Sequence, residues 1–110
     1  MGDMRFCVAI ATSGSIDPRW GRADRVAVGD VQDGAITEWT EHEVGWGASH
    51  DAGTEGSHHA NVARFLRDQG VQAVAVDHMG AGMVRMLTTM EIRIETGQSG
   101  DAREAVSRLA

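Results

Sequence analysis

Runs of apolar residues alternate with glycine-rich polar segments along this chain, and the apolar spacing changes between its two halves. Residues 4–11 form an almost unbroken apolar run that ends at the sequence TSGS, a pattern typical of a buried central strand. Because successive side chains of a strand point to opposite faces, Phe6, Val8 and Ile10 are expected on one face. Cys7 is expected on the opposite face.

Two further strands are predicted at residues 25–31 and 35–43. An Asp-Gly pair lies between them, which is a strong hairpin signal because glycine tolerates the positive φ of tight turns. In the second of these strands, simple alternation puts Ile36 and Trp39 on opposite faces. The segment that follows, residues 45–56, is rich in glycine and is predicted to be a long loop.

The second half of the chain shows helical spacing of its apolar positions, interrupted by short apolar runs. The predicted helices are residues 57–69, 82–90 and 101–109, and the predicted strands between them are residues 73–76 and 92–95. Ser57 is expected to be the N-cap of the first helix, and Gly70 is expected to end it. Asp101 and Glu104 are spaced for a capping box at the start of the last helix.

This order of elements predicts an α/β fold. The first three strands form an antiparallel meander, and right-handed crossovers make the later two strands parallel to the first. The result is a mixed five-stranded sheet with helices packed on its faces. The length of 110 residues suits one domain, residues 1–110.

Composition and charge narrow the classes of partner. The formal net charge is −6, which argues against nucleic acid and against an anionic membrane surface as the main partner. No apolar run is long enough to span a bilayer, and the N-terminal run leads directly into a strand pattern, so a cytoplasmic location is expected. Cys7 is the only cysteine, which excludes a disulfide within one chain and a thiolate zinc cage.

The predicted topology gathers the chemistry at one edge of the sheet. Segments that follow strands pointing the same way lie together there, and ligands of open α/β sheets bind beyond the carboxyl ends of the strands. The segments are residues 12–24, 43–57, 77–80 and 96–100. All five histidines lie on or beside this edge: His42, His50, His58, His59 and His78.

His58 and His59 open the first predicted helix, in the sequence GSHH. At the angular spacing of a helix, both are expected to face the sheet, whereas Arg64 and Arg67 face solvent. The positive end of the helix dipole favours the neutral imidazole, which is the form that binds metals. The alternative is that either histidine is a structural partner for loop carbonyl groups.

Three stretches carry a resemblance to a known family: VAIATSGS, WGRADRVAVGDV and GVQAVAVDHMGAGMVRMLTTMEIRIETG. In order and spacing, the chain from Met4 to Leu109 resembles the dinitrogenase iron–molybdenum cofactor biosynthesis proteins. The residues that match the family's motifs are Gly21, Arg22, Ala23, Gly80, Gly82 and Leu87. Arg19 stands where many members have histidine, Trp20 replaces a phenylalanine, and Glu91 replaces a glycine.

The resemblance implies a ribonuclease-H-like three-layer fold, with strand order 3-2-1-4-5 and helices on both faces. It also implies that the chain binds or carries an iron–sulfur or iron–molybdenum-type metal cluster or its precursor, without catalysis. Proteins that donate or accept the cluster are the implied partners.

The site expected for such a cargo combines positive charge, backbone N–H groups at helix starts, and soft or imidazole ligands. The residues expected to bind it are Ser13, Gly14, Arg19, Trp20, Gly21, Arg22, Gly80 and Gly82. The five histidines are the expected ligands, for a cluster or for a divalent metal such as zinc. Cys7 is a further thiolate candidate, although its mid-strand position favours a small core residue. The methionines of the helix at residues 82–90 are interpreted as packing residues.

Two other functions stay open at this point. The edge loops could form a small oxyanion-binding or protein-interaction module, in which Arg and Trp side chains are favoured. A zinc-dependent hydrolase using His50, His58 and His59 is conceivable, but the chain has no HExxH spacing. A nuclease with two metal ions would need clustered carboxylates, and residues 4–11 contain none. The oligomeric state is not predicted.

Overall fold

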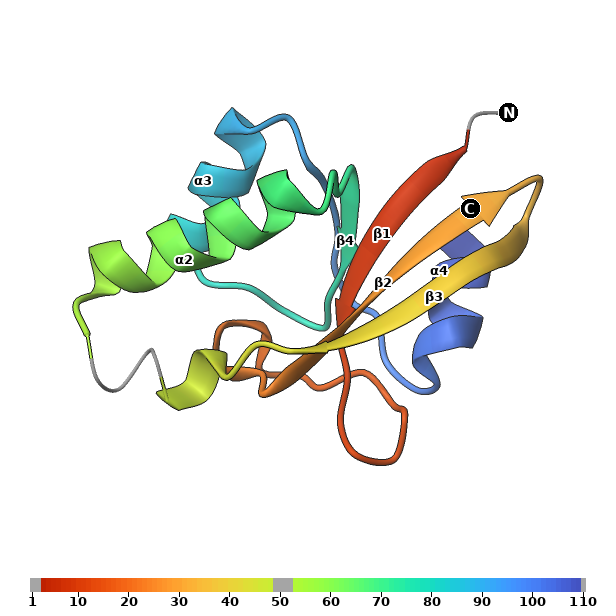
Figure 1. Ribbon diagram of the computed structural model, residues 1–110, viewed down its shortest axis with the longest axis horizontal. Helices are drawn as coiled ribbons and strands as arrows, with labels where there is room; N and C mark the ends of the chain where they lie inside the picture. The colour runs from red at the N-terminus through yellow and green to blue at the C-terminus, as the bar shows by residue number, and fades with distance from the viewer. Residues whose placement is uncertain (1–2, 49–52, 110) are drawn as a thin grey trace.

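A single mixed sheet organises the protein. The computed structural model describes residues 3–48 and 53–109, and its five strands follow the order β3-β2-β1-β4-β5, as predicted (Figure 1). The strands are β1 (Met4–Ala9), β2 (Arg25–Gln32), β3 (Ala35–Glu43), β4 (Ala73–Ala75) and β5 (Arg93–Glu95). The β1–β2 and β2–β3 pairs are antiparallel, whereas β4 runs parallel to both β1 and β5.

Helices cover both faces of the sheet and complete three layers. They are the short 3-10 helix η1 (Trp20–Arg22) and the α-helices α2 (Glu55–Asp68), α3 (Ala81–Thr89) and α4 (Ala102–Leu109). Figure 1 shows α2 and α3 together on one side of the sheet and α4 on the other. Cys7 packs on the α2–α3 side with Leu66, and Phe6 packs on the α4 side with Val106. The predicted alternation of the first strand is therefore confirmed.

The start of α2 differs from the prediction. Its N-cap is Thr54 rather than Ser57, because the Thr54 hydroxyl oxygen accepts a hydrogen bond from the Ser57 backbone N–H at 3.1 Å. Both residue types make good N-caps, and sequence alone does not choose between them. His58 consequently lies one turn inside the helix. Residues 46–48 are also helical, within the segment that was predicted to be a loop.

The ends of two helices follow the prediction more closely. Gly70, with φ of 68°, directly follows the C-cap of α2, as expected for a residue in the left-handed region. At the start of α4, the Glu104 backbone N–H donates to the Asp101 carboxylate at 3.0 Å, which forms one half of the predicted capping box.

The simple alternation predicted for β3 is wrong. The pairing register shifts between Asp30 and Val31, so that Val31 pairs with Ile36. As a result, Ile36 and Trp39 both pack on the α4 side of the sheet. The Trp39 ring lies over Gly29, where a Cβ atom would come within 2.8 Å of its Cε3 atom. An irregularity of this kind leaves no clear trace in the hydrophobic pattern.

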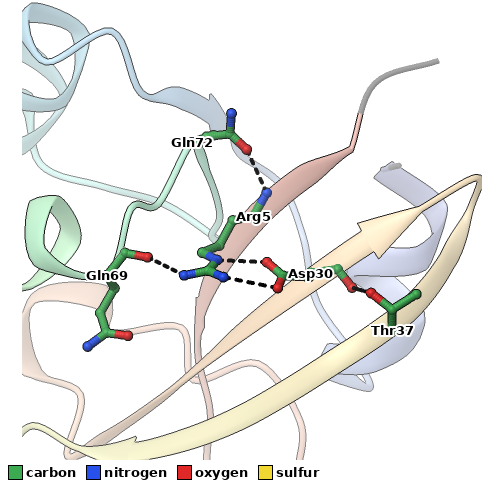
Figure 2. Close-up of polar contacts among 5 residues, drawn as sticks. All are labelled: Arg5, Asp30, Thr37, Gln69 and Gln72. Atoms are coloured by element: carbon green, nitrogen blue, oxygen red, sulfur yellow. Dashed lines mark hydrogen bonds and ion pairs between the residues drawn. The ribbon is translucent and has the colours of Figure 1, made fainter.

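Arg5 ties the sheet to the end of α2 (Figure 2). Its guanidinium donates to both carboxylate oxygens of Asp30, at 2.7 and 3.0 Å, and to the carbonyl oxygen of Gln69 at 2.7 Å. The Arg5 backbone N–H also donates to the Gln72 side chain at 2.9 Å. The hydrogen bonds to the Asp30 carboxylate and its negative charge raise the pKa of Arg5 above its ordinary value. These contacts fix the C-terminal end of α2 against β1 and β2.

Candidate functional site

Two loops meet at the predicted edge, between β1 and β4. Arg19 follows β1 and His78 follows β4, and their backbones form an isolated parallel bridge. From β1 the chain continues toward β2, and from β4 it continues toward α3 and β5, so the connections diverge at this point. This is the arrangement in which open α/β sheets bind ligands.

A cavity of about 390 Å³ lies at this junction, and we refer to it as the cleft. Three segments enclose it: η1 with the residue before it, the second turn of α2, and the loop that leads into α3. The described residues that line it are Arg19, Trp20, Gly21, Arg22, His58, His59, His78, Met79, Gly80, Ala81, Gly82 and Met83. Nine of the thirteen predicted site residues are in this set.

The described residues that line the cleft include cationic side chains, in a protein whose formal net charge is −6, and one of them, Arg19, is paired with Asp17. Two guanidinium groups and three imidazoles line the cleft, and among the described lining residues there is no carboxylate. A cavity lined by one sign of charge concentrates the electric field and attracts ligands of the opposite sign. The chemistry of the lining therefore suits an anion.

Arg19 lies at the edge of the cleft and is oriented by Asp17. The Asp17 carboxylate, which is only 9% exposed, accepts hydrogen bonds from the Arg19 backbone N–H at 2.9 Å and from Arg19 Nε at 3.3 Å. The Arg19 side chain nevertheless remains 65% exposed. Arg19 also lines a second, larger cavity on its other side, so it separates the two.

The two histidines of α2 have different exposures. His58 is 2% exposed, and its Nε2 atom would lie 3.5 Å from a Cβ atom placed on Gly21. Its imidazole thus lies over the backbone of η1. His59 is half-buried, and the centres of the two rings are 5.9 Å apart. As predicted, both face inward, while Arg64 and Arg67 are exposed.

The N-terminus of α3 forms another wall of the cleft. Its N-cap is Gly80, and no side chain within the described ranges caps this helix. The N–H groups of a first turn have no partners inside their own helix, and the helix dipole adds partial positive charge there. Met79 and Met83 lie on either side of this helix start and contribute thioether side chains to the lining.

A cluster of aromatic side chains packs η1 against the rest of the protein. Trp20 is 3% exposed and packs edge-to-face on Trp46, with ring centres 5.1 Å apart. Trp46 in turn contacts Phe65 of α2 at 5.8 Å. Gly47 permits a close approach, because a Cβ atom there would lie 2.9 Å from the Arg22 carbonyl oxygen. The wall that presents Arg19 and Arg22 therefore rests on a packed aromatic cluster.

Three predicted site residues in the described ranges, Ser13, Gly14 and His42, do not line the cleft. Ser13 and Gly14 lie beside α4, where the Gly14 carbonyl oxygen accepts from the Ala102 N–H at 3.1 Å. His42 packs its ring on Phe65, with centres 5.3 Å apart. His50 falls outside the described residues. The prediction placed these residues by strand direction alone, which distinguishes neither the two faces of the sheet, as for Ser13 and Gly14, nor positions along its edge, as for His42.

Cys7 is not part of the cleft. It is fully buried beneath α2 and α3, and burial raises the pKa of its thiol. Across residues 3–48 and 53–109, no group of three or more His, Cys, Asp or Glu side chains is arranged to hold a metal ion. No helix in the described ranges is long and apolar enough to cross a membrane.

Comparison with known families decides the family of the chain. The sequence model of the family described as dinitrogenase iron–molybdenum cofactor matches residues 4–110. The chain belongs to this family. Membership indicates a role related to the iron–molybdenum cofactor of dinitrogenase, as the sequence resemblance implied. Comparison with curated proteins finds no match.

Several solved structures have the same fold as this chain. The apo form of the orange protein from Desulfovibrio gigas is 25% identical, with a TM-score of 0.74, and the match covers 96% of this chain and 86% of that one. A dinitrogenase candidate from Methanocaldococcus jannaschii is 11% identical, with a TM-score of 0.69 and coverage of 99% and 88%. A NifB candidate from Thermotoga is 17% identical, with a TM-score of 0.65 and coverage of 96% and 86%. The last two similarities support the fold alone.

Proposed function

We propose that the cleft binds an anionic iron–sulfur or iron–molybdenum-type metal cluster, or a precursor of one, and carries it without catalysis. One observation carries this proposal: Arg19, Arg22 and three histidines line a cavity that also contains the start of α3. Family membership and the similarity to the orange protein support it. Donor and acceptor proteins for the cluster would be the partners.

The electrostatics of the fold favour this cargo. Cations are stabilised near the C-terminus of a helix and destabilised near its N-terminus. Here Arg19 and Arg22 line the same cavity as the first turn of α3 and the early residues of α2. An anion between these groups would receive hydrogen bonds from several sides.

The same lining fits a bare metal cation poorly. A zinc ion would lie beside two guanidinium groups, and zinc sites usually have four ligands in a tetrahedral arrangement. The three described histidines of the cleft do not form a preassembled ligand group. A cluster that arrives with its own sulfide ligands would need only charge compensation and at most one or two imidazole bonds. Carriage of a preassembled cluster is therefore preferred to zinc hydrolysis.

The test is anaerobic reconstitution of the purified protein with iron and sulfide, followed by analysis of protein-bound iron, acid-labile sulfide and visible absorption. We expect wild type to retain a coloured cluster, and the double variant His58→Ala, His59→Ala to lose most of it. His42→Ala is the matched control, because His42 lies outside the cleft. Wild type that retains no iron or sulfide would reject the proposal, and so would a double variant that retains as much as His42→Ala.

A further inference from the structure

Two methionines distinguish the cleft from an ordinary oxyanion site. The chain has six methionines, and Met79 and Met83 both line this cavity, one just before the N-cap of α3 and one in its first turn. Met83 is 5% exposed and Met79 is half-buried, and both pack against the core on the α2–α3 side. Their position is therefore fixed by the fold.

The remainder of the lining sharpens this distinction. In many oxyanion sites, hydroxyl and amide side chains act together with arginines and backbone N–H groups to replace the hydrogen bonds that oxygen atoms lose with water. Among the described residues of the cleft there is no Ser, Thr, Asn or Gln. Between its cationic groups the wall consists of thioether, methyl and indole surface, contributed by Met79, Met83, Ala81 and Trp20.

A thioether interacts differently with oxygen and with sulfur. It donates no hydrogen bond, so an oxyanion placed against it loses water without compensation. Its sulfur is soft and polarisable, so contact with a large polarisable atom such as sulfide gains dispersion energy. Specificity is the difference between the affinities for the two kinds of anion. The lost hydration of an oxyanion and the dispersion contact of a sulfur anion both favour the sulfur anion.

We propose that the cleft selects anions whose outer atoms are sulfur over oxyanions of the same charge and shape, and that Met79 and Met83 set this selectivity. This inference rests on the proposed function, because it concerns the same cleft. It also argues against the small oxyanion-binding module that the sequence left open. The methionines act as specificity-determining residues, in addition to the packing role predicted for Met83.

The experiment compares tungstate with tetrathiotungstate, two tetrahedral dianions that differ in oxygen and sulfur. Isothermal titration gives the dissociation constant of each anion with wild type, Met79→Gln, Met83→Gln and Met90→Gln. Glutamine keeps the length of methionine and adds N–H donors. We expect wild type to bind the thioanion more tightly, and either cleft variant to lower the oxyanion-to-thioanion ratio of dissociation constants about tenfold. Met90 lies at the far end of α3 outside the cleft, so Met90→Gln should leave the ratio unchanged.

The outcomes separate this inference from the proposed function. Equal affinity of wild type for both anions, no measurable binding of either, or an unchanged ratio in Met79→Gln would overturn the selectivity. Since Met83 is almost fully buried, Met79→Gln is decisive if Met83→Gln unfolds. A protein that discriminates the two anions through Met79 but retains no cluster on reconstitution would support the inference and reject the proposed function.

Discussion

The two ends of helix α2 contact the rest of the protein in different ways. At the C-terminal end, Arg5 donates to the Gln69 carbonyl oxygen and to both carboxylate oxygens of Asp30 (Figure 2). Toward the N-terminal end, His58 and His59 line a cleft beside Arg19, whose side chain is 65% exposed. Both ends place an arginine near the helix, and at the C-terminal end Arg5 donates a hydrogen bond to the helix itself.

This difference separates structural from functional charge. A cation beside the last carbonyl groups of a helix is favourable, and Arg5 stabilises the fold in this way. Cations near helix starts are unfavourable, and Arg19 and Arg22 line the cavity that also contains the start of α3. We infer that the first arrangement serves stability and that the second serves to bind a ligand. The following predictions test this contrast.

The largest effect is expected from removing both arginines of the cleft. Arg19→Ala, Arg22→Ala should weaken binding of tetrathiotungstate about a hundredfold, because each charge-assisted contact contributes about a tenfold factor. The control is Arg64→Ala, Arg67→Ala, which removes the same charge from the exposed face of α2. Titration calorimetry measures both. Equal losses in the two double variants would mean that net charge rather than the cleft determines affinity.

The contrast assumes that the Cys7 thiol is buried in the core and is not available in the cleft. The pH dependence of stability tests this assumption. Burial raises the pKa of the Cys7 thiol in the folded state, so the native protein keeps its proton where the unfolded chain loses it. Above about pH 8.5, the stability of wild type should therefore fall by about 1.4 kcal/mol per pH unit more steeply than that of Cys7→Ala, and below this pH the two proteins should have the same pH dependence. Urea unfolding of both proteins from pH 7 to pH 10 checks the slope. Parallel curves, or modification of native Cys7 by a thiol reagent, would show an accessible thiol.

Sequence reasoning predicted most of the fold because the periodic apolar pattern reports directly on burial. The run at residues 4–11 and the helical spacing around Leu66 and Leu87 correctly identified a buried strand and two helices, and the family resemblance implied the strand order that the structure shows. Sequence reasoning failed where a single local contact determines the start of a helix or the register of a strand pair. The Thr54 cap and the register shift beside Val31 depend on geometry that similar residues could equally provide.

For the site, strand direction correctly placed Arg19, His58 and Gly80 at one edge. It could not separate the two faces of that edge, so Ser13, which lies on the α4 side, was included. It also did not select Met79 as a lining residue, although residues 77–80 were placed at this edge. The signal was available: Met79 directly precedes the glycine that begins α3.

Neutralising the structural end of α2 should affect stability without affecting the cleft. Asp30→Asn removes the charge that Arg5 contacts while keeping the size of the side chain. Because this pair is partly exposed, we expect only a small loss in the free energy of unfolding. Thioanion affinity should stay within about twofold of wild type. Asp33→Asn, in the exposed hairpin turn, is the control of equal charge. A parallel loss of affinity in Asp30→Asn would mean that the two ends are coupled.

The smallest expected effect concerns Asp17, a structural carboxylate that contacts the cleft residue Arg19. In wild type its carboxylate orients Arg19 and is compensated by it. Arg19→Ala leaves that carboxylate, only 9% exposed, beside the cleft without its cation. Adding Asp17→Asn to Arg19→Ala should therefore tighten thioanion binding about twofold, because one repulsive charge disappears. The gain should shrink in high salt, since screening weakens the interaction. Titrations of both variants at two ionic strengths measure it. If the double variant bound no more tightly than Arg19→Ala, Asp17 would act only on the local backbone, and the cleft would respond to Arg19 alone.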